Sequence, residues 1–577
     1  MAEVETIADI VALSGAAHGA SPALQTFGDE GLTLAYTFGE AARLSELLAR
    51  RLAASGAARG GHVALVGENC PEWAVAALGV YRSGAALVPI DAKLKAGEIR
   101  NILGRAKPRL VLSARRLLPL AEEAAAGLDR AQRLCLEDLL GESALAEAAR
   151  LPPAAPAPCR PDDAAIVSFT SGTTGPPKGI VLTHRNIVAN VEASRSAISC
   201  GPTDAFVSLL PLNHLFEHTV GFLLPLRCGA RVTYLRSIKP RTVLAAIEAS
   251  GATLCLIVPA VARLFYKEAT ARIGDLPAWR RRLFRGLYGA ARGAGRAGIP
   301  LGPLILGNVG RRFGRRMRQF VCGGAPLEAE VAEFFACIGL PILQGYGLSE
   351  AAPVVSSNTV GANRVGSVGR PLGGVEVRIA PCAGFDPPAG PDAPTASWAG
   401  EGPPVGEVLV RGPNVMAGYF ESPEATSEVL RQGWLHTGDL GWLDSEGFLY
   451  ICGRLKDVII GESGKNVYPA EVEQEIAARP GIKEVCVLGR RVAGPAGATE
   501  LVVALVAPTD ELAASLGGDE LRSLLRREIQ EACRRLADYK QPRYFAVWQG
   551  ELPKTTTLKF RKHEIARELD GLPLEPV

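Results

Sequence analysis

The sequence predicts an α/β protein with doubly wound parallel sheets in a large amino-terminal domain and a small α+β domain at the carboxyl end. Three observations support this. Strand-like apolar runs alternate with amphipathic helical stretches, a β-rich region with short turns follows them, and the pattern changes again near residue 456. A chain of 577 residues is also too long for one ordinary hydrophobic core, so we expect at least two domains.

The alternation is clearest near the amino end, where an apolar run at 62–67, a helical stretch at 71–84 and an apolar run at 86–91 follow one another. The same alternation predicts further strands at 231–235, 253–259 and 319–324. Parallel strands need a crossover connection, usually a helix, so this order predicts parallel sheets with helices on their faces.

A Pro- and Gly-rich loop at 381–404 precedes the β-rich region, in which 406–412 and 447–454 resemble short strands; we expect a distorted barrel there. Beyond residue 456 the order is a helix (470–480), two strands (483–492 and 500–508), a charged helix (519–539) and a strand (543–550). We therefore expect a large domain over residues 1–455 and a small domain over 456–577.

Composition excludes several classes of protein. Hydrophobic residues make up 47% and charged residues 21%, which is typical of a globular enzyme, and a net charge of +3 predicts no affinity for nucleic acid. The twelve cysteines show no metal-ligand spacing. The amino end lacks the pattern of a signal peptide, and no apolar run reaches eighteen residues, so we expect a cytoplasmic protein with reduced thiols.

The stretch TSGTTGPPKG (170–179) is the strongest local signal. Glycines let the backbone approach an anion closely, and successive N–H groups in such a loop form a nest for phosphate. The hydroxyl side chains and Lys178 add donors and charge. A Walker A loop enters a helix after its lysine, whereas Lys178 precedes the strand-like GIVLT, so this is a different phosphate loop. Taken alone, the stretch is also compatible with a flexible turn.

TSGTTGPPKG resembles the signature loop of the adenylate-forming superfamily, which includes acyl-CoA synthetases, luciferases and the adenylation domains of peptide synthetases. Further blocks follow in the order of that family, and together they cover about residues 30 to 565: LLPLNHLFEH (209–218), VCGGAPL (321–327), QGYGLSE (344–350), GWLHTGDLG (433–441), GRLKDVIIGESGKNVYPAEVE (453–473) and PKTTTLKFRK (553–562). Six motifs in the right order make a chance match very improbable.

The resemblance implies that a carboxylic acid reacts with ATP to give acyl-AMP and pyrophosphate, and that CoA then takes the acyl group. The form TLK at 557–559, NCPEW at 69–73 and a lengthened segment before residue 321 resemble long-chain fatty acyl-CoA synthetases, which implies a medium- or long-chain fatty acid. The alternatives are an acyl-AMP ligase that loads an acyl carrier protein and a CoA ligase for aryl or other acids. Intact Lys559, Glu350 and Asp439 argue against a non-catalytic acid-binding relative.

The resemblance also assigns residues to ATP and Mg²⁺. The phosphate contacts would be Thr170, Ser171, Gly172, Thr173, Thr174, Gly175 and Lys178, and the magnesium ligands Glu350 and Thr174. The adenine segments are Gly323, Gly324, Ala325, Gln344, Gly345, Tyr346 and Gly347, with Ser349 retaining the hydroxyl of the threonine usual in the family. Asp439 and Arg454 would contact the ribose, although an isolated TGD is more commonly a turn with a capping aspartate.

Four further residues receive roles from the resemblance. Lys559 would bridge the attacking carboxylate and the α-phosphate, although Leu558 stands where most members have glycine, and an exposed lysine among basic neighbours is the alternative. Lys456 corresponds to the hinge of the small domain, and Gly464 would border the pantetheine tunnel for CoA. His214 corresponds to a gate between acyl site and tunnel, and a structural histidine is equally compatible with the sequence.

The segment from Arg280 to Arg318 contains eleven arginines and neither Asp nor Glu, interleaved with apolar residues. Such a stretch is typical of a basic amphipathic surface that meets anionic lipid, which would place the protein at the inner face of a membrane. A solvated helical hairpin fits the pattern equally well, and these arginines could also meet the phosphates of CoA.

Overall fold

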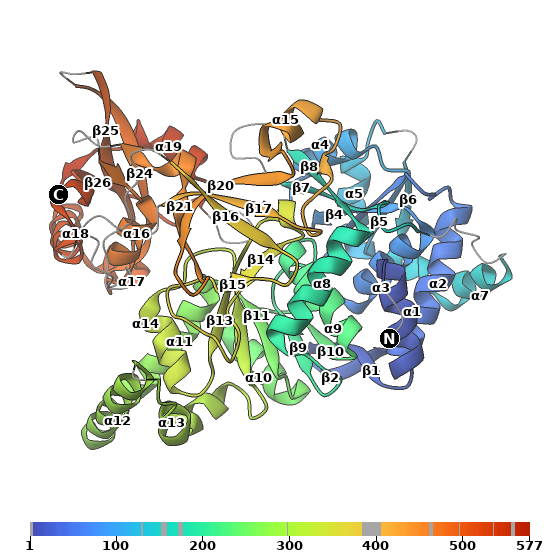
Figure 1. Ribbon diagram of the computed structural model, residues 1–577, viewed down its shortest axis with the longest axis horizontal. Coiled ribbons are helices and arrows are strands. Elements are labelled where there is room, and N and C mark those ends of the chain that lie inside the picture. Colours follow the sequence, from blue (N-terminus) through green and yellow to red (C-terminus); the bar gives the residue numbers. More distant parts are fainter. Residues whose placement is uncertain are drawn as a thin grey trace.

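The computed structural model describes residues 4–128, 131–151, 159–170, 177–296, 298–382, 405–460, 465–494, 497–534, 536–554 and 560–577. Two large sheets with helices between and around them form the main body, and a smaller lobe that carries the carboxyl end stands beside it (Figure 1). The predicted α/β class is confirmed.

The larger sheet has nine strands, of which the central six are parallel. In spatial order they are β15 (Arg370–Pro371), β14 (Val354–Ser357), β13 (Ile342–Gly347), β12 (Gln319–Cys322), β11 (Leu254–Ile257), β9 (Ala205–Ser208), β10 (Arg231–Leu235), β1 (Pro22–Gly28) and β2 (Gly31–Thr37). The antiparallel strands β15, β14 and β2 lie at the two edges.

The second sheet has seven strands, parallel from β7 to β6. In spatial order they are β18 (Gly418–Tyr419), β8 (Lys178–Thr183), β7 (Ala164–Thr170), β4 (Ala86–Asp91), β3 (His62–Gly67), β5 (Leu110–Ser113) and β6 (Gln132–Cys135). The strand predicted after Lys178 is therefore present as β8, which pairs antiparallel with β7.

Alternate residues of the strands point into different layers of the core. In β3, Val63 and Leu65 pack between the two sheets, whereas Ala64 and Val66 face the outer helices. Strands β11 and β12 alternate in the same way, because side chains along a strand point to opposite faces. Both faces of both sheets are thus buried, which explains why these strands are continuous apolar runs in the sequence.

The helices fill three layers around the sheets. Those packed between the sheets are α1 (Ile7–His18), α2 (Phe38–Ala54), α3 (Pro71–Ser83), α8 (His184–Ile198), η2 (Glu217–Leu223) and α9 (Leu224–Cys228). Outside the nine-stranded sheet lie α10 (Pro240–Ser250), α11 (Pro259–Gly274), α12 (Ala278–Arg296), α13 (Gly302–Gly310), η3 (Arg311–Phe313) and α14 (Ala329–Cys337). Outside the seven-stranded sheet lie α4 (Ala96–Ala106) and α5 (Leu118–Ala124), and η1 (Arg115–Leu117), α6 (Leu136–Leu139) and α7 (Glu142–Arg150) complete this half.

The β-rich region forms a third, antiparallel sheet of five strands. It consists of β16 (Glu376–Pro381), β17 (Gly406–Arg411), β20 (Trp434–Leu443), β19 (Leu430–Arg431) and β21 (Leu449–Arg454), with α15 (Pro423–Val429) before β19. The long strand β20 pairs with β17, β19 and β21.

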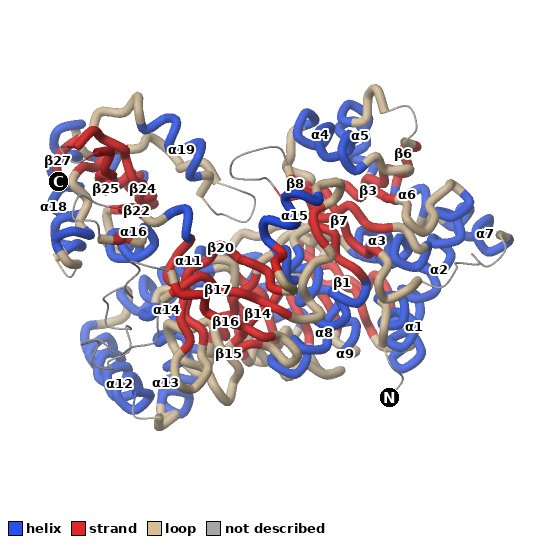
Figure 2. The backbone as a smooth tube through the Cα atoms, turned by 45° about the horizontal axis from the view of Figure 1, so that its top comes forward, coloured by secondary structure: helices blue, strands red, loops and turns tan. Residues whose placement is uncertain are grey.

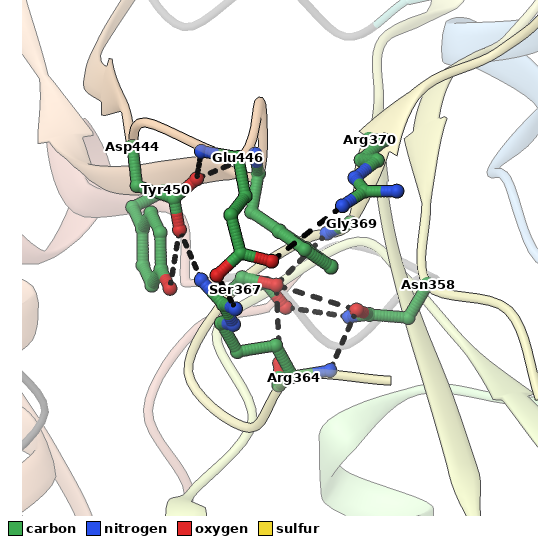
Figure 3. A network of polar contacts seen from close by, with 9 residues as sticks. Asn358, Arg364, Ser367, Gly369, Arg370, Asp444, Glu446 and Tyr450 are labelled. Atoms are coloured by element: carbon green, nitrogen blue, oxygen red, sulfur yellow. Dashed lines mark hydrogen bonds and ion pairs between the residues drawn. The ribbon is translucent and has the colours of Figure 1, made fainter. Parts of the chain in front are cut away.

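A polar network fixes the turn between β20 and β21 against the loop that follows β14 (Figure 3). Arg364 binds Asp444 at 2.5 Å and also pairs with Glu446, while its backbone N–H donates to the side chain of Asn358 at 3.0 Å. The guanidinium of Arg364 also lies 4.3 Å from the centre of the Phe448 ring. Through these contacts the third sheet is joined to the edge of the nine-stranded sheet.

The carboxy-terminal lobe has its own four-stranded sheet and lies apart from the two large sheets (Figure 2). Its strands are β24 (Ile482–Gly494), β25 (Gly497–Pro508), β26 (Tyr544–Val547) and β27 (Glu575–Pro576). Helices α16 (Pro469–Ala477) and α18 (Gly518–Cys533) cover one face and α19 (Lys562–Leu569) covers the other. The remaining elements are η4 (Ser349–Ala351), η5 (Leu455–Asp457), β22 (Ile459–Ile460), β23 (Asn466–Val467), α17 (Asp510–Ser515) and η6 (Asp538–Lys540).

One predicted helix is shorter in the structure than in the prediction. The helix expected over 519–539 ends at Cys533, because the chain then turns so that Lys540 becomes buried. The Lys540 ammonium binds both carboxylate oxygens of Glu471 on α16 at 2.8 Å. The predicted domain boundary after residue 455 falls within η5, and it remains a prediction.

Candidate functional site

The candidate site lies at the carboxyl ends of the parallel strands β12 and β13, where ligands bind in open α/β sheets. Gly323, Gly324 and Ala325 follow β12 directly. Gln344, Gly345, Tyr346 and Gly347 are the last four residues of β13, and Ser349 and Glu350 follow in η4. The two segments predicted for adenine are therefore neighbours.

Buried asparagines hold the turn that carries Glu350. Asn190, on α8, donates to the carbonyl of Val354 at 2.7 Å and accepts from its N–H at 3.2 Å. Asn414 donates to the carbonyl of Ala351 at 2.9 Å. At Gly347 a Cβ would lie 2.1 Å from the carbonyl oxygen of Pro353, so only glycine fits this close approach.

Three predicted residues meet across the nine-stranded and five-stranded sheets. The Tyr346 hydroxyl donates to Asp439 at 2.6 Å, and the guanidinium of Arg454 lies 2.9 Å from the other carboxylate oxygen. Asp439 and Arg454 are cross-strand partners on β20 and β21. The carboxylate is buried, with 8% of its side chain exposed, whereas 56% of the Arg454 side chain is exposed.

The environment of Asp439 keeps its neighbours protonated. Burial, and then the Asp439 charge, hold the pKa of Tyr346 well above its usual range. The Asp439 charge also raises the pKa of Arg454. The part of β20 before Asp439 is held by Glu407 on β17, which accepts from the N–H of Gly438 at 3.0 Å and contacts Nδ1 of His436 at 2.9 Å. A rigid carboxylate thus faces the end of β13.

A second group of polar side chains surrounds Glu350. The Tyr419 hydroxyl donates to Glu350 at 2.9 Å, and the ammonium of Lys178 lies 5.0 Å from the centre of the Tyr419 ring. Burial, and then Glu350, raise the pKa of Tyr419. The carboxylate is therefore held at the hydroxyl of this ring, and the cation lies over the ring itself.

The ends of the phosphate loop are in place. Thr170 on β7 pairs with Lys178 on β8, so the loop closes a hairpin between two antiparallel strands. This confirms that the segment is not the strand-to-helix loop of Walker A proteins. Residues 171–176, which include the predicted contacts Ser171, Gly172, Thr173, Thr174 and Gly175, lie outside the described residues, and their roles stay predictions.

The block at 209–218 is held by Asn69, from the NCPEW stretch. Its amide donates to the carbonyl of Leu210 at 2.6 Å, and its oxygen accepts from the N–H of Leu212 at 2.7 Å. His214 is half-buried just before η2, and Phe216 lies 3.5 Å from the position of a Cβ on Gly323. The block at 209–218 and the first segment predicted for adenine are thus neighbours.

Glu217, the next residue in that block, is fully buried between the sheets. It accepts hydrogen bonds from Ser208 and from the N–H of Leu210, and its Oε2 has no partner among the residues that the structure describes. Burial raises the pKa of this carboxyl to about 8. Glu217 is therefore mainly protonated near neutral pH.

The predicted residues of the carboxy-terminal lobe are only partly described. Lys456 is exposed in η5, whereas Gly464 and Lys559 lie outside the described residues and their roles stay predictions. Lys554 and Phe560, which flank the segment with Lys559, pair in an isolated β-bridge. Lys562 lies 3.3 Å from Asp457, the residue that follows Lys456.

Sequence reasoning missed Tyr419 and the positioning role of Asn69. Tyr419 lies in no block that pointed to chemistry, and only the fold brings it to Glu350, 69 positions away. Asn69 lies in the NCPEW stretch, but its bonds to a loop 141 and 143 positions later are visible only in the structure.

Comparison with known proteins agrees with this geometry. Residues 14–420 match the AMP-binding enzyme family, and residues 471–559 match the AMP-binding enzyme C-terminal domain. A feruloyl-CoA synthase of Amycolatopsis sp is 32% identical over 92% of this chain and 94% of its own. A long-chain-fatty-acid–CoA ligase of Escherichia coli O157:H7 is 32% identical over 71% of this chain and 63% of its own. ATP-bound MatB from Rhodopseudomonas palustris superposes with a TM-score of 0.73 at 27% identity, covering 97% and 98% of the two chains.

The raised pKa of Glu217 predicts a pH-dependent stability. Its folded-state pKa of about 8 exceeds the ordinary value of 4.5, so the folded chain keeps a proton that the unfolded chain releases. The free energy of unfolding therefore falls as the pH rises from 4.5 through 8. Glu217→Gln should gain about 2 kcal/mol relative to the wild type between about pH 6 and pH 8.5 in urea denaturation.

The control is Glu122→Gln, which removes an exposed carboxylate on α5 and should follow the wild type across this pH range. Other titrating groups cancel in the difference between variant and wild type. Equal pH dependence of Glu217→Gln and the wild type would show that the buried carboxyl does not titrate as inferred.

Proposed function

Since the chain belongs to the AMP-binding enzyme family, we propose that it joins a medium- or long-chain fatty acid to CoA through an acyl-AMP intermediate. The coarser class, an AMP-forming acid–CoA ligase, comes with the family and the relatives. The observation that supports a fatty acid is a surface, formed by α12 and α13, that suits the lipid from which such an acid is delivered. The E. coli relative named as a long-chain-fatty-acid–CoA ligase agrees with it.

An aromatic acid is the second candidate. The feruloyl-CoA synthase of Amycolatopsis sp aligns with 92% of this chain, whereas the E. coli fatty-acid ligase aligns with 71%, at the same identity. This wider match supports an aryl substrate. A third possibility concerns the acceptor, because holo acyl carrier protein presents the same pantetheine thiol as CoA.

The described site fits ATP. Asp439 is buried, oriented by Tyr346 and Arg454, and able to accept hydrogen bonds from both ribose hydroxyls. The hydrogen bond to Asp439 fixes the Tyr346 ring at the end of β13, where it would stack on adenine. Lys178 enters β8 at the base of the phosphate loop and would bind the β- and γ-phosphates.

Glu350 fits a magnesium ligand. Its Oε1 is oriented by Tyr419, and carboxylate oxygens are the ligands that Mg²⁺ prefers. The second ligand that we propose is Thr174. Bound Mg²⁺ would supply positive charge beside the phosphate oxygens. The chain's own contribution is to hold Glu350 rigidly through Asn190 and Asn414.

The remaining roles concern the two half-reactions. We assign to Lys559 the approach of the carboxylate to the α-phosphate, because a cation there offsets the charge of two anions that must meet. Lys456 would be the hinge between the domains 1–455 and 456–577, Gly464 would border the CoA tunnel, and His214 would gate it. Lys562, bound to Asp457 and near Glu473 at 3.6 Å, supports the segment that carries Lys559.

The surface proposed to meet the membrane is called the basic face below and consists of the exposed residues of α12, α13 and η3. Trp279 and Leu283 on α12 are 62% and 55% exposed, and Leu304 on α13 is 83% exposed. A group of exposed large apolar side chains, unlike one scattered singly, is typical of a surface that meets another molecule.

The charge of the basic face is largely uncompensated. Arg280, Arg281, Arg282 and Arg285 have no carboxylate partner within the described parts of the chain. The side of α12 that carries Phe284, Tyr288 and Ala291 packs on the core, so the arginines and Trp279 face outward. No helix among the described residues is long and apolar enough to cross a bilayer, so we propose peripheral contact only.

An acid panel tests the proposed reaction. The protein is incubated with ATP, Mg²⁺ and CoA, and with fatty acids of graded length, ferulate or acetate, and pyrophosphate release is measured. We expect the highest kcat/KM for one fatty-acid length, and replacing CoA by holo acyl carrier protein separates the acceptors. If ferulate were the best acid, the proposed substrate would be an aryl acid and not a fatty acid. If none of the acids gave pyrophosphate release, the proposed activity would be refuted.

Lys559→Ala separates the half-reactions. We expect acyl-AMP formation to fall by at least about a hundredfold, because a charge that stabilises the transition state is lost, while thioester formation from supplied acyl-AMP stays within about threefold. Lys554→Ala, in the same segment but paired with Glu484, is the control and should spare both steps. If both half-reactions fell equally in Lys559→Ala, the assigned role would be wrong.

Flotation with vesicles tests the basic face. Arg281→Glu/Arg282→Glu should reduce binding to vesicles of phosphatidylglycerol by about tenfold or more at low salt, since each arginine near an anionic surface contributes about 1 kcal/mol. Arg115→Glu/Arg116→Glu, an exposed pair beside α5, makes the same charge change elsewhere and should bind as the wild type does. Equal loss in both variants, or no binding by the wild type, would exclude this contact.

A further inference from the structure

A polar cavity lies at the amino ends of the parallel strands of the nine-stranded sheet, whereas the candidate site lies at their carboxyl ends. Its volume is about 490 Å³, and its lining comes from the segments that lead into β9, β11 and β12. Because these strands are parallel, their amino ends lie on one side of the sheet and their carboxyl ends, with the candidate site, on the opposite side. The lining residues are Ser199, Cys200, Gly201, Thr203, Asp204, Thr253, Arg316 and Arg318.

Only one of the two arginines in the lining is neutralised. Arg318 lies 2.7 Å from Asp204, whose side chain is 8% exposed and also accepts from the Thr253 hydroxyl at 2.7 Å. Arg316 donates to the carbonyl of Thr203 at 3.2 Å and has no carboxylate partner in the described part of the chain. The cavity therefore carries an excess positive charge.

A third arginine adds to this charge. Arg231, the first residue of β10, also has no carboxylate partner among the described residues. Its Nη2 lies 3.6 Å, and Nη1 of Arg316 3.7 Å, from the same point, the position of a Cβ on Gly251. Burial, and then Arg316, lower the pKa of Arg231. Two like charges are held together without an acid between them.

The end of α10 explains part of this arrangement. Arg231 donates to the carbonyl of Ser250, the last residue of that helix, at 2.8 Å. A helix carries roughly half a negative charge at its carboxyl end. This offsets at most part of one guanidinium, so Arg231 and Arg316 together remain cationic.

We propose that this cavity binds a phosphate-type oxyanion, held by Arg316, supported by Arg231 and flanked by the hydroxyls of Ser199 and Thr203. Guanidinium groups form paired hydrogen bonds with phosphate oxygens, and an anion there relieves the repulsion between the two arginines. The oxyanion is either free phosphate or the headgroup of an anionic lipid, since Arg316 belongs to the same arginine-rich segment as the basic face.

Titration of the full chain with inorganic phosphate at low ionic strength, followed by calorimetry, tests the site. The experiment is run in a Lys178→Ala background, so that the candidate nucleotide site contributes little. We expect Arg316→Ala to weaken phosphate binding by about tenfold or more, because a charged hydrogen-bond donor is lost. Arg315→Ala, the neighbouring residue paired with Glu248, is the matched control and should stay within about twofold.

A second arm uses phosphatidylglycerol vesicles with the same variants. Phosphate binding that depends on Arg316 supports a free anion as the ligand. Vesicle binding that depends on Arg316 more than on Arg315, without binding of inorganic phosphate, supports a lipid headgroup. If neither depends on Arg316, the proposed site is overturned, and that result leaves the acid–CoA ligase activity untouched because pyrophosphate release is measured separately.

Discussion

The candidate site depends on the buried carboxylate of Asp439, which joins two sheets that the chain forms separately. Tyr346 approaches it from the nine-stranded sheet, and Arg454 from the neighbouring strand of the third sheet. A buried carboxylate without partners would cost several kcal/mol, so the two sheets must meet with this geometry. Arg364 fixes the same hairpin from its turn, through Asp444 and Glu446. The Asp439 carboxylate is therefore held in place by the protein's own contacts.

The same principle applies to Glu350, although the supports there are neutral amides. Asn190 and Asn414 bond backbone groups of the segment from η4 to the start of β14, so side chains from distant parts of the chain hold the turn that carries Glu350. Asn69 does the same for the loop before His214. Buried asparagines can both donate and accept, which suits irregular backbone where strands end.

The fold was largely predictable, because the strands of both sheets are apolar runs between Gly and Pro signals, as at 62–67 and 86–91. The site residues named from the motifs fall into two groups. Tyr346, Asp439 and Arg454 lie together, although their roles remain predictions, whereas Ser171 to Gly175, Gly464 and Lys559 lie outside the described residues. Tyr419 and the helix end at Cys533 could not be predicted, because both follow from contacts between distant segments: Glu350 with Tyr419, and Glu471 with Lys540.

The amino ends and the carboxyl ends of the parallel strands in the nine-stranded sheet differ in how their charges are balanced. At the carboxyl ends of the strands, Arg454 neutralises Asp439, whereas Glu350 accepts from the neutral hydroxyl of Tyr419 and the ammonium of Lys178 lies over that ring. At the amino ends positive charge is in excess. Asp204 is paired with Arg318, and the carboxyl end of α10 offsets only part of the charge of Arg231 and Arg316. A chain that is nearly neutral as a whole thus has local regions of unbalanced charge. The anion affinity that we propose at either end of these strands rests on these local groups, because a net charge of +3 over 577 residues is too small to provide it.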